Sequence, residues 1–140
     1  PAWLMNLPQV RRLGPVLARQ LGQNEAFFRQ TYLDPNRISD DRLAAMSIHT
    51  QVADWDLALW EYLRAWSVDL SALAGQFGEI DQPALIVSGD SDTIVPVEDS
   101  QRLNTALQNS DLVILPQCGH VPQEECPEAF VGAVDAWLRR

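Results

Sequence analysis

Two short segments of the sequence hold side chains that could do acid–base chemistry. Residues 89–96 read Gly-Asp-Ser-Asp-Thr-Ile-Val-Pro and offer the carboxylates of Asp90 and Asp92. Residues 116–122 read Pro-Gln-Cys-Gly-His-Val-Pro and offer His120, one of two histidines in the chain. An Asp that accepts from one ring nitrogen of a His holds its tautomer, which leaves the other nitrogen to act as a base. The two segments together predict proton transfer in support of a nucleophile.

Each segment follows an apolar run that predicts a buried strand, over residues 84–88 and over residues 112–115. Helices are predicted around these strands at about 70–77, from Pro96 to about 107, and from Pro127 to the end of the chain. The alternation of helix and strand implies parallel strands covered by helices. In such sheets ligands lie beyond the C-terminal ends of the strands, which is where both segments are expected. Residues 116–126 are predicted to be one long loop.

Residues 1–67 have a helical pattern and contain four of the five tryptophans. Gly14 and Pro15 are expected to break the first apolar pattern, because Pro cannot continue a helix. Asn24 and Ser39 are predicted N-caps of the helices that follow them. The aromatic residues favour a helical core stripe, and the alternative is that some of them line an apolar pocket.

The second half of the chain resembles the α/β-hydrolase family. Residues 83–96 look like the late strand and acid loop of that family, with Gly-x-x-Asp followed by Val-Pro, and by that match Asp92 is the triad acid. Residues 118–130 look like the Gly-His loop and last helix of the family, ending in a Glu-x-Pro-x-x-Phe pattern that begins at Glu125. By that match His120 is the triad histidine, and the acid precedes the histidine as the family order requires.

The chain departs from this family in one large respect. No serine has glycines at both flanking positions, so the Gly-x-Ser-x-Gly nucleophile elbow is absent. The oxyanion-hole loop and the strands that would precede the helical part are absent too. The resemblance therefore implies a partial fold of the α/β class, with a helical cap at residues 1–67 and the C-terminal portion of the core at residues 68–140. The nucleophile, Ser or Asp, is left open.

The resemblance implies part of a hydrolase that acts on an ester-like or related small apolar substrate, without cofactor or metal. We expect the chain alone to be inactive, and to pair either with a missing N-terminal half or with itself through an exposed strand edge. The alternative is a stand-alone remnant without catalysis, acting as an oligomeric binding or structural module.

Other interpretations of single residues stay open at this point. Asp90 could be the working acid and Asp92 a turn former, and His120 could be an ordinary loop histidine. Ser91 is expected to be a turn residue rather than a nucleophile. His49, in the helical half, is interpreted as structural or solvated.

Composition excludes several functions. The net charge of −9 disfavours nucleic acid as a partner, because an acidic chain repels phosphate backbones. No apolar run approaches the length of a membrane span. Cys118 and Cys126 are too few for a secreted disulfide scaffold, so a reducing compartment, the cytoplasm, is the default expectation. Their spacing around His120 is not that of a usual zinc motif.

Overall fold

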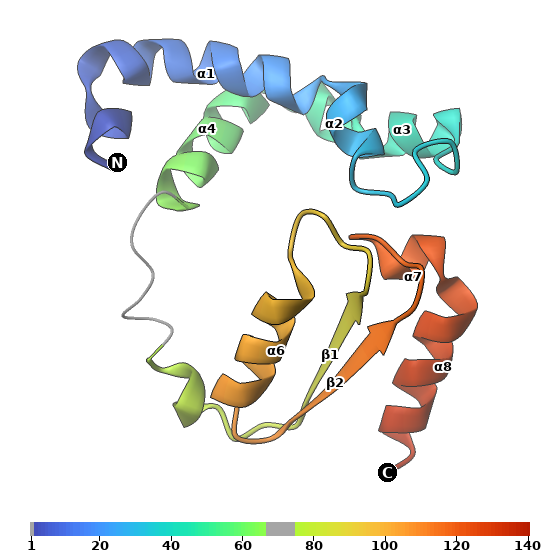
Figure 1. Ribbon diagram of the computed structural model, residues 1–140. Helices are drawn as coiled ribbons and strands as arrows, with labels where there is room; N and C mark the ends of the chain where they lie inside the picture. The colour runs from blue at the N-terminus through green and yellow to red at the C-terminus, as the bar shows by residue number, and fades with distance from the viewer. Residues whose placement is uncertain (1, 67–74) are drawn as a thin grey trace. The chain divides into compact units, whose positions relative to one another are not determined.

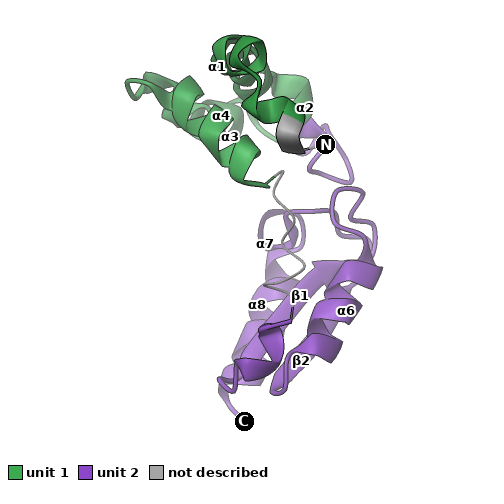
Figure 2. Cartoon of the chain, turned by 90° about the vertical axis from the view of Figure 1, so that its left-hand side faces the viewer, with its two compact units in different colours: residues 1–28, 38–71 green, residues 29–37, 72–140 purple. Residues whose placement is uncertain are grey.

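The computed structural model describes residues 2–66 and 75–140. The chain divides into two compact units, one formed by residues 1–28 and 38–71 and the other by residues 29–37 and 72–140 (Figure 2). The second unit thus includes a short piece of the N-terminal half. In the two described ranges, no helix is both long enough and apolar enough to cross a membrane.

The first unit is helical. Its elements are η1 (Ala2–Asn6), α1 (Pro8–Gly22), α2 (Glu25–Arg29, which ends at the unit boundary), α3 (Asp40–Met46), η2 (Ile48–Gln51) and α4 (Trp55–Trp66). The two predicted N-caps are confirmed. The side chain of Asn24 accepts from the amide of Ala26 at 3.0 Å, and that of Ser39 accepts from the amide of Arg42 at 3.2 Å.

The predicted break at Gly14 and Pro15 is wrong, because α1 continues through both residues. The physical reason lies in α4, which packs on α1 at this turn (Figure 1). A Cβ added at Gly14 would lie 2.0 Å from the indole of Trp60, so the missing side chain is what lets that buried ring approach. Tertiary packing here outweighs the poor helix propensity of the pair. Trp60 therefore belongs to the core of this unit.

The second unit is a small parallel sheet between helices. Its elements are η3 (Phe77–Glu79), β1 (Ala84–Gly89), α6 (Val97–Ala106), β2 (Ser110–Leu115), α7 (Pro122–Glu125) and α8 (Pro127–Leu138). The strands pair in parallel, with Ala84 opposite Ser110 and Gly89 opposite Leu115. α6 and α8 both contact the strands and flank them from opposite sides (Figures 1 and 2). This arrangement confirms the predicted parallel strands with helices on both sides.

Two details differ from the prediction. The region from 116 to 126 is not one loop, because the four-residue helix α7 lies within it. Pro122 occupies a first-turn position of α7, where proline favours the start of a helix, and Glu125 ends the helix. With four residues, α7 is too short to leave a periodic pattern in the sequence. Of the helix predicted at about 70–77, residues 70–74 lie outside the described residues, and Phe77 begins the 3-10 helix η3.

Candidate active site

The loops that follow β1 and β2 touch each other directly. The amide of Asp90 donates to the carbonyl of Leu115 at 2.9 Å, and the amide of Ser91 donates to the carbonyl of Cys118 at 3.0 Å. Gly89, buried at the end of β1, makes this approach possible, since a Cβ there would lie 2.2 Å from the carbonyl oxygen of Cys118. The glycine of the Gly-x-x-Asp pattern therefore serves packing between the two loops.

Asp92 and His120 form a hydrogen-bonded pair across these loops. The Oδ2 atom of Asp92 lies 3.0 Å from Nδ1 of His120. The other carboxylate oxygen, Oδ1, accepts from the amides of Ile94 at 2.8 Å and Val95 at 2.9 Å. The Asp92 side chain is only 7% exposed, whereas that of His120 is 35% exposed. The acid is thus buried and fixed, and the imidazole is open to a reactant.

The electrostatics of Asp92 suit this pairing. Burial acts to raise its pKa, but hydrogen bonds from the Val95 amide, the His120 ring and the Ile94 amide, with the charge of His120, outweigh burial and hold the pKa below its ordinary value. Asp92 is therefore a carboxylate at neutral pH. With Nδ1–H donating to that carboxylate, Nε2 of His120 is left as the acceptor for a proton.

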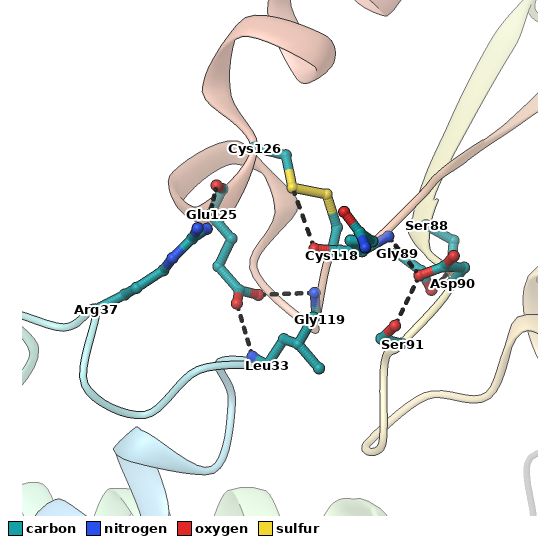
Figure 3. Close-up of a disulfide and its surroundings, with 11 residues drawn as sticks. Leu33, Arg37, Ser88, Gly89, Asp90, Ser91, Cys118, Gly119, Glu125 and Cys126 are labelled. Carbon is teal, nitrogen blue, oxygen red and sulfur yellow. Dashed lines mark hydrogen bonds between the residues drawn. A yellow bond between two sulfur atoms is a disulfide. The ribbon is translucent and has the colours of Figure 1, made fainter.

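Asp90, the alternative acid, has a different place. Its Oδ1 accepts from the amide of Gln117 at 2.8 Å and from the hydroxyl of Ser91 at 2.7 Å (Figure 3). Gln117 has a φ of 54°, the left-handed region that non-glycine residues rarely adopt. Asp90 therefore supports the turn that leads into the His120 loop, and Ser91 is engaged in the same turn.

His49 lies in the first unit. Its Nδ1 is 2.9 Å from the carbonyl oxygen of Met46, and its ring meets the ring of Trp55 edge-on at 5.0 Å between centroids. The ring of Phe28 lies 6.5 Å away. These neighbours are consistent with the structural role expected for this histidine.

Cys118 and Cys126 form a disulfide that closes the loop around His120 (Figure 3). Cys118 is fully buried and Cys126 is half-buried. This pairing was not predicted, because two cysteines are too few for a disulfide scaffold and their separation of 8 positions carries no signal of pairing by itself. Sulfur atoms bonded to each other offer no thiolate ligand, so in this state the Cys-His-Cys spacing does not form a metal site.

A segment that the sequence analysis missed also contributes to the site. A cavity of about 60 Å³ reaches His120 within the second unit. It is lined by Gln30, Thr31, Tyr32, Leu33, Ser91, Thr93, Gly119 and His120. Such a volume accommodates a small group or a few water molecules. Residues 30–33 lie far from His120 in sequence, and they have no motif that would have linked them to it.

The chain is similar in sequence to proteins that are named as an esterase and as a hydrolase. The chain is 35% identical over 66 residues to a pimeloyl-[acyl-carrier protein] methyl ester esterase from Nitrosomonas europaea, a match over 47% of this chain and 26% of that protein. It is 32% identical over 104 residues to a 2-hydroxy-6-oxononadienedioate/2-hydroxy-6-oxononatrienedioate hydrolase from Paraburkholderia xenovorans, over 69% of this chain and 34% of that protein. These matched segments span about a quarter to a third of the curated relatives.

Solved structures show the same fold. The 2-hydroxy-6-oxo-6-phenylhexa-2,4-dienoate hydrolase from Rhodococcus sp. strain RHA1 superposes with a TM-score of 0.70 at 20% identity, over 91% of this chain and 49% of that chain. The chain therefore spans about half the length of this neighbour. The model of the alpha/beta hydrolase family matches residues 1–133. Together with the parallel strands and the loops that follow them, this match shows that the chain belongs to the alpha/beta hydrolase family.

Proposed function

We propose that this chain supplies the acid and the histidine of a hydrolytic triad, Asp92 and His120, to a hydrolase whose nucleophile comes from an N-terminal half. The carrying observation is the 3.0 Å contact between Asp92 Oδ2 and His120 Nδ1, with the second oxygen of Asp92 held by two backbone amides. In this arrangement Asp92 orients the imidazole and stabilises its protonated form. Nε2 then accepts the proton of the nucleophile or of the hydrolytic water.

The proposed substrate is a small, apolar ester or a related electrophile. Residues 1–67 would act as a cap, and the apolar surface of the first unit supports this role. Leu13, Val16 and Leu17 of α1 share one helix face and are each more than half exposed, as is Trp66 of α4. Two relatives are named as a methyl ester esterase and as a hydrolase of an oxo-dienedioate, so the family match alone leaves the type of bond open.

The test is a pair of matched substitutions in a protein where an N-terminal half with a nucleophile elbow precedes this chain. Asp92→Asn is expected to lower kcat by about three to four orders of magnitude, since the amide favours the wrong imidazole tautomer. Asp90→Asn keeps an oxygen that can accept from Gln117 and Ser91, so its kcat should stay within a few-fold. A silent Asp92→Asn with a crippling Asp90→Asn would refute the assignment.

The second candidate is a non-catalytic module that self-associates. The observation that favours it is the sheet, which in the described residues has two strands only. The coding sequence upstream of Pro1 discriminates the two proposals. Strands and an elbow motif encoded there support the hydrolase, and their absence supports the module.

We propose the cytoplasm as the location. In that compartment cellular thiols would reduce the Cys118–Cys126 disulfide that the structure contains, because disulfides persist mainly in oxidising compartments. Thiol labelling in freshly lysed cells tests this: two free thiols support the proposal, and an intact disulfide contradicts it.

A further inference from the structure

Glu125 is a buried carboxylate that the acid–base pair does not use. It ends α7 and is 8% exposed. One oxygen, Oε1, accepts from the amide of Leu33 at 2.6 Å, and the other, Oε2, accepts from the amide of Gly119 at 2.8 Å (Figure 3). Burying a carboxylate is costly unless its oxygens are satisfied, and two backbone amides meet that need here.

Of the two amides bound by Glu125, one belongs to the chain segment of His120 and the other to the segment that is hydrogen-bonded to it. Gly119 directly precedes His120 in the chain. Leu33 belongs to the other segment, where the carbonyl of Thr31 accepts from the amide of His120 at 3.0 Å. The contacts therefore form a closed ring, from Glu125 to Gly119 and His120, on to Thr31 and Leu33, and back to Glu125. All of these residues belong to the second unit.

The space at Gly119, between Glu125 and Leu33, is filled. A Cβ added at Gly119 would lie 2.5 Å from Oε2 of Glu125 and 2.7 Å from the amide nitrogen of Leu33. The backbone next to His120 therefore sits directly against the carboxylate and cannot shift toward Leu33. The hydrogen bond between His120 Nδ1 and Asp92 Oδ2 is 3.0 Å long. Because the imidazole is attached to this backbone, a shift of residues 119 and 120 would move Nδ1 away from Asp92.

We propose that Glu125 is a positioning residue for His120. Its hydrogen bond to the Leu33 amide also fixes residues 31–33, which line the adjacent cavity. This inference rests on the proposed function for the meaning of His120, but its geometry can be tested without activity. Glu125 needs both carboxylate oxygens, because each faces an N–H donor. A glutamine at this position keeps the shape but turns an NH₂ group toward one of the two donors.

The experiment compares Glu125→Gln with Glu128→Gln in this chain. Glu128 lies nearby at the start of α8 and is exposed, so its variant removes the same charge without touching the ring of contacts. NMR measures amide hydrogen exchange at Gly119 and His120 and the Nδ1–H signal of the His120 ring. We expect Glu125→Gln to speed exchange at both amides by about tenfold or more and to weaken the Nδ1–H signal, while Glu128→Gln changes neither.

Three outcomes would overturn the proposal. One is a Glu125→Gln chain with unchanged exchange and an unchanged Nδ1–H signal. Another is equal effects from Glu128→Gln. The third is general unfolding by Glu125→Gln, with exchange raised throughout the second unit and not only at Gly119 and His120, since Glu125 would then support the fold rather than His120. Failure of the proposed function would instead show as a silent Asp92→Asn in the activity assay, with these NMR results unaffected.

Discussion

Substitution of Gly89 by alanine tests the closest approach in the site. The added Cβ would lie 2.2 Å from the carbonyl oxygen of Cys118 and 2.4 Å from that of Gly119. Ordinary contact begins at 3.4 Å, so the shortfall is about 1.2 Å at the nearer atom. Both atoms belong to the backbone of the loop that carries His120, which cannot rotate aside as the end of a side chain can.

The expected cost of Gly89→Ala has two parts. Overpacking of a filled site costs about 1–3 kcal/mol, of which alanine recovers roughly 0.5–1 kcal/mol by restricting the unfolded chain. Because the clash is with backbone atoms, the upper end of this cost applies, and we expect a net loss of about 2–2.5 kcal/mol in the free energy of unfolding. A retreat of the loop by about 1 Å would also stretch the 3.0 Å contact between Asp92 and His120 beyond hydrogen-bond range.

Urea unfolding and the Nδ1–H signal of His120 measure the two effects separately. Gly132→Ala is the matched control, because nothing lies within 4 Å of a Cβ added there in α8. The control should stabilise the chain by up to about 1 kcal/mol and leave the His120 signal unchanged. A Gly89→Ala chain that is as stable as its parent, with the His120 signal intact, would refute the close approach of the two loops.

Reducing the Cys118–Cys126 disulfide, whose cysteines are 8 positions apart, should lower the free energy of unfolding by about 2.5 kcal/mol on the chain-entropy model, and equal urea midpoints with and without dithiothreitol would contradict this. The lowered pKa of Asp92 should contribute stability above its ordinary value of 3.8 that is lost as the pH falls through the lowered pKa, and Asp92→Asn should abolish this part of the acid dependence of unfolding. Sedimentation velocity at micromolar concentration should show self-association through the edge of β1 that has no strand partner among the described residues, and a concentration-independent monomer would disprove this.

The sequence predicted the second unit better than the first, for physical reasons. Its strands are continuous apolar runs, and the loops that follow parallel strands must meet at one edge of the sheet, so Asp92 and His120 could be brought together from sequence alone. The preference for Asp92 over Asp90 came from the family pattern, and the structure shows why only one of them reaches the imidazole. Asp90 is held by the turn at Gln117.

Two features that the sequence did not predict, the unbroken helix α1 and the burial of Glu125, share one cause, which is contact between segments distant in sequence. α1 continues through Gly14 because Trp60 packs against that glycine, and nothing near residue 14 indicates this. Glu125 bonds to Leu33 across most of the chain, and no local pattern links the two residues. Such contacts decide where a broken pattern becomes a helix and which carboxylate becomes buried, so tertiary structure is needed to find them.

The geometry of the acid–base pair does not depend on a nucleophile. Every contact described for Asp92 and His120 comes from residues of the second unit, including the hydrogen bond from the His120 amide to Thr31. The pair should therefore be formed in this chain alone. A chain with the His120 Nδ1–H signal present, but with no hydrolysis of p-nitrophenyl esters beyond that by free imidazole, would have a positioned base and no nucleophile for it to activate. Turnover by the chain that disappears in His120→Ala would contradict this separation and would show that the chain contains a nucleophile of its own.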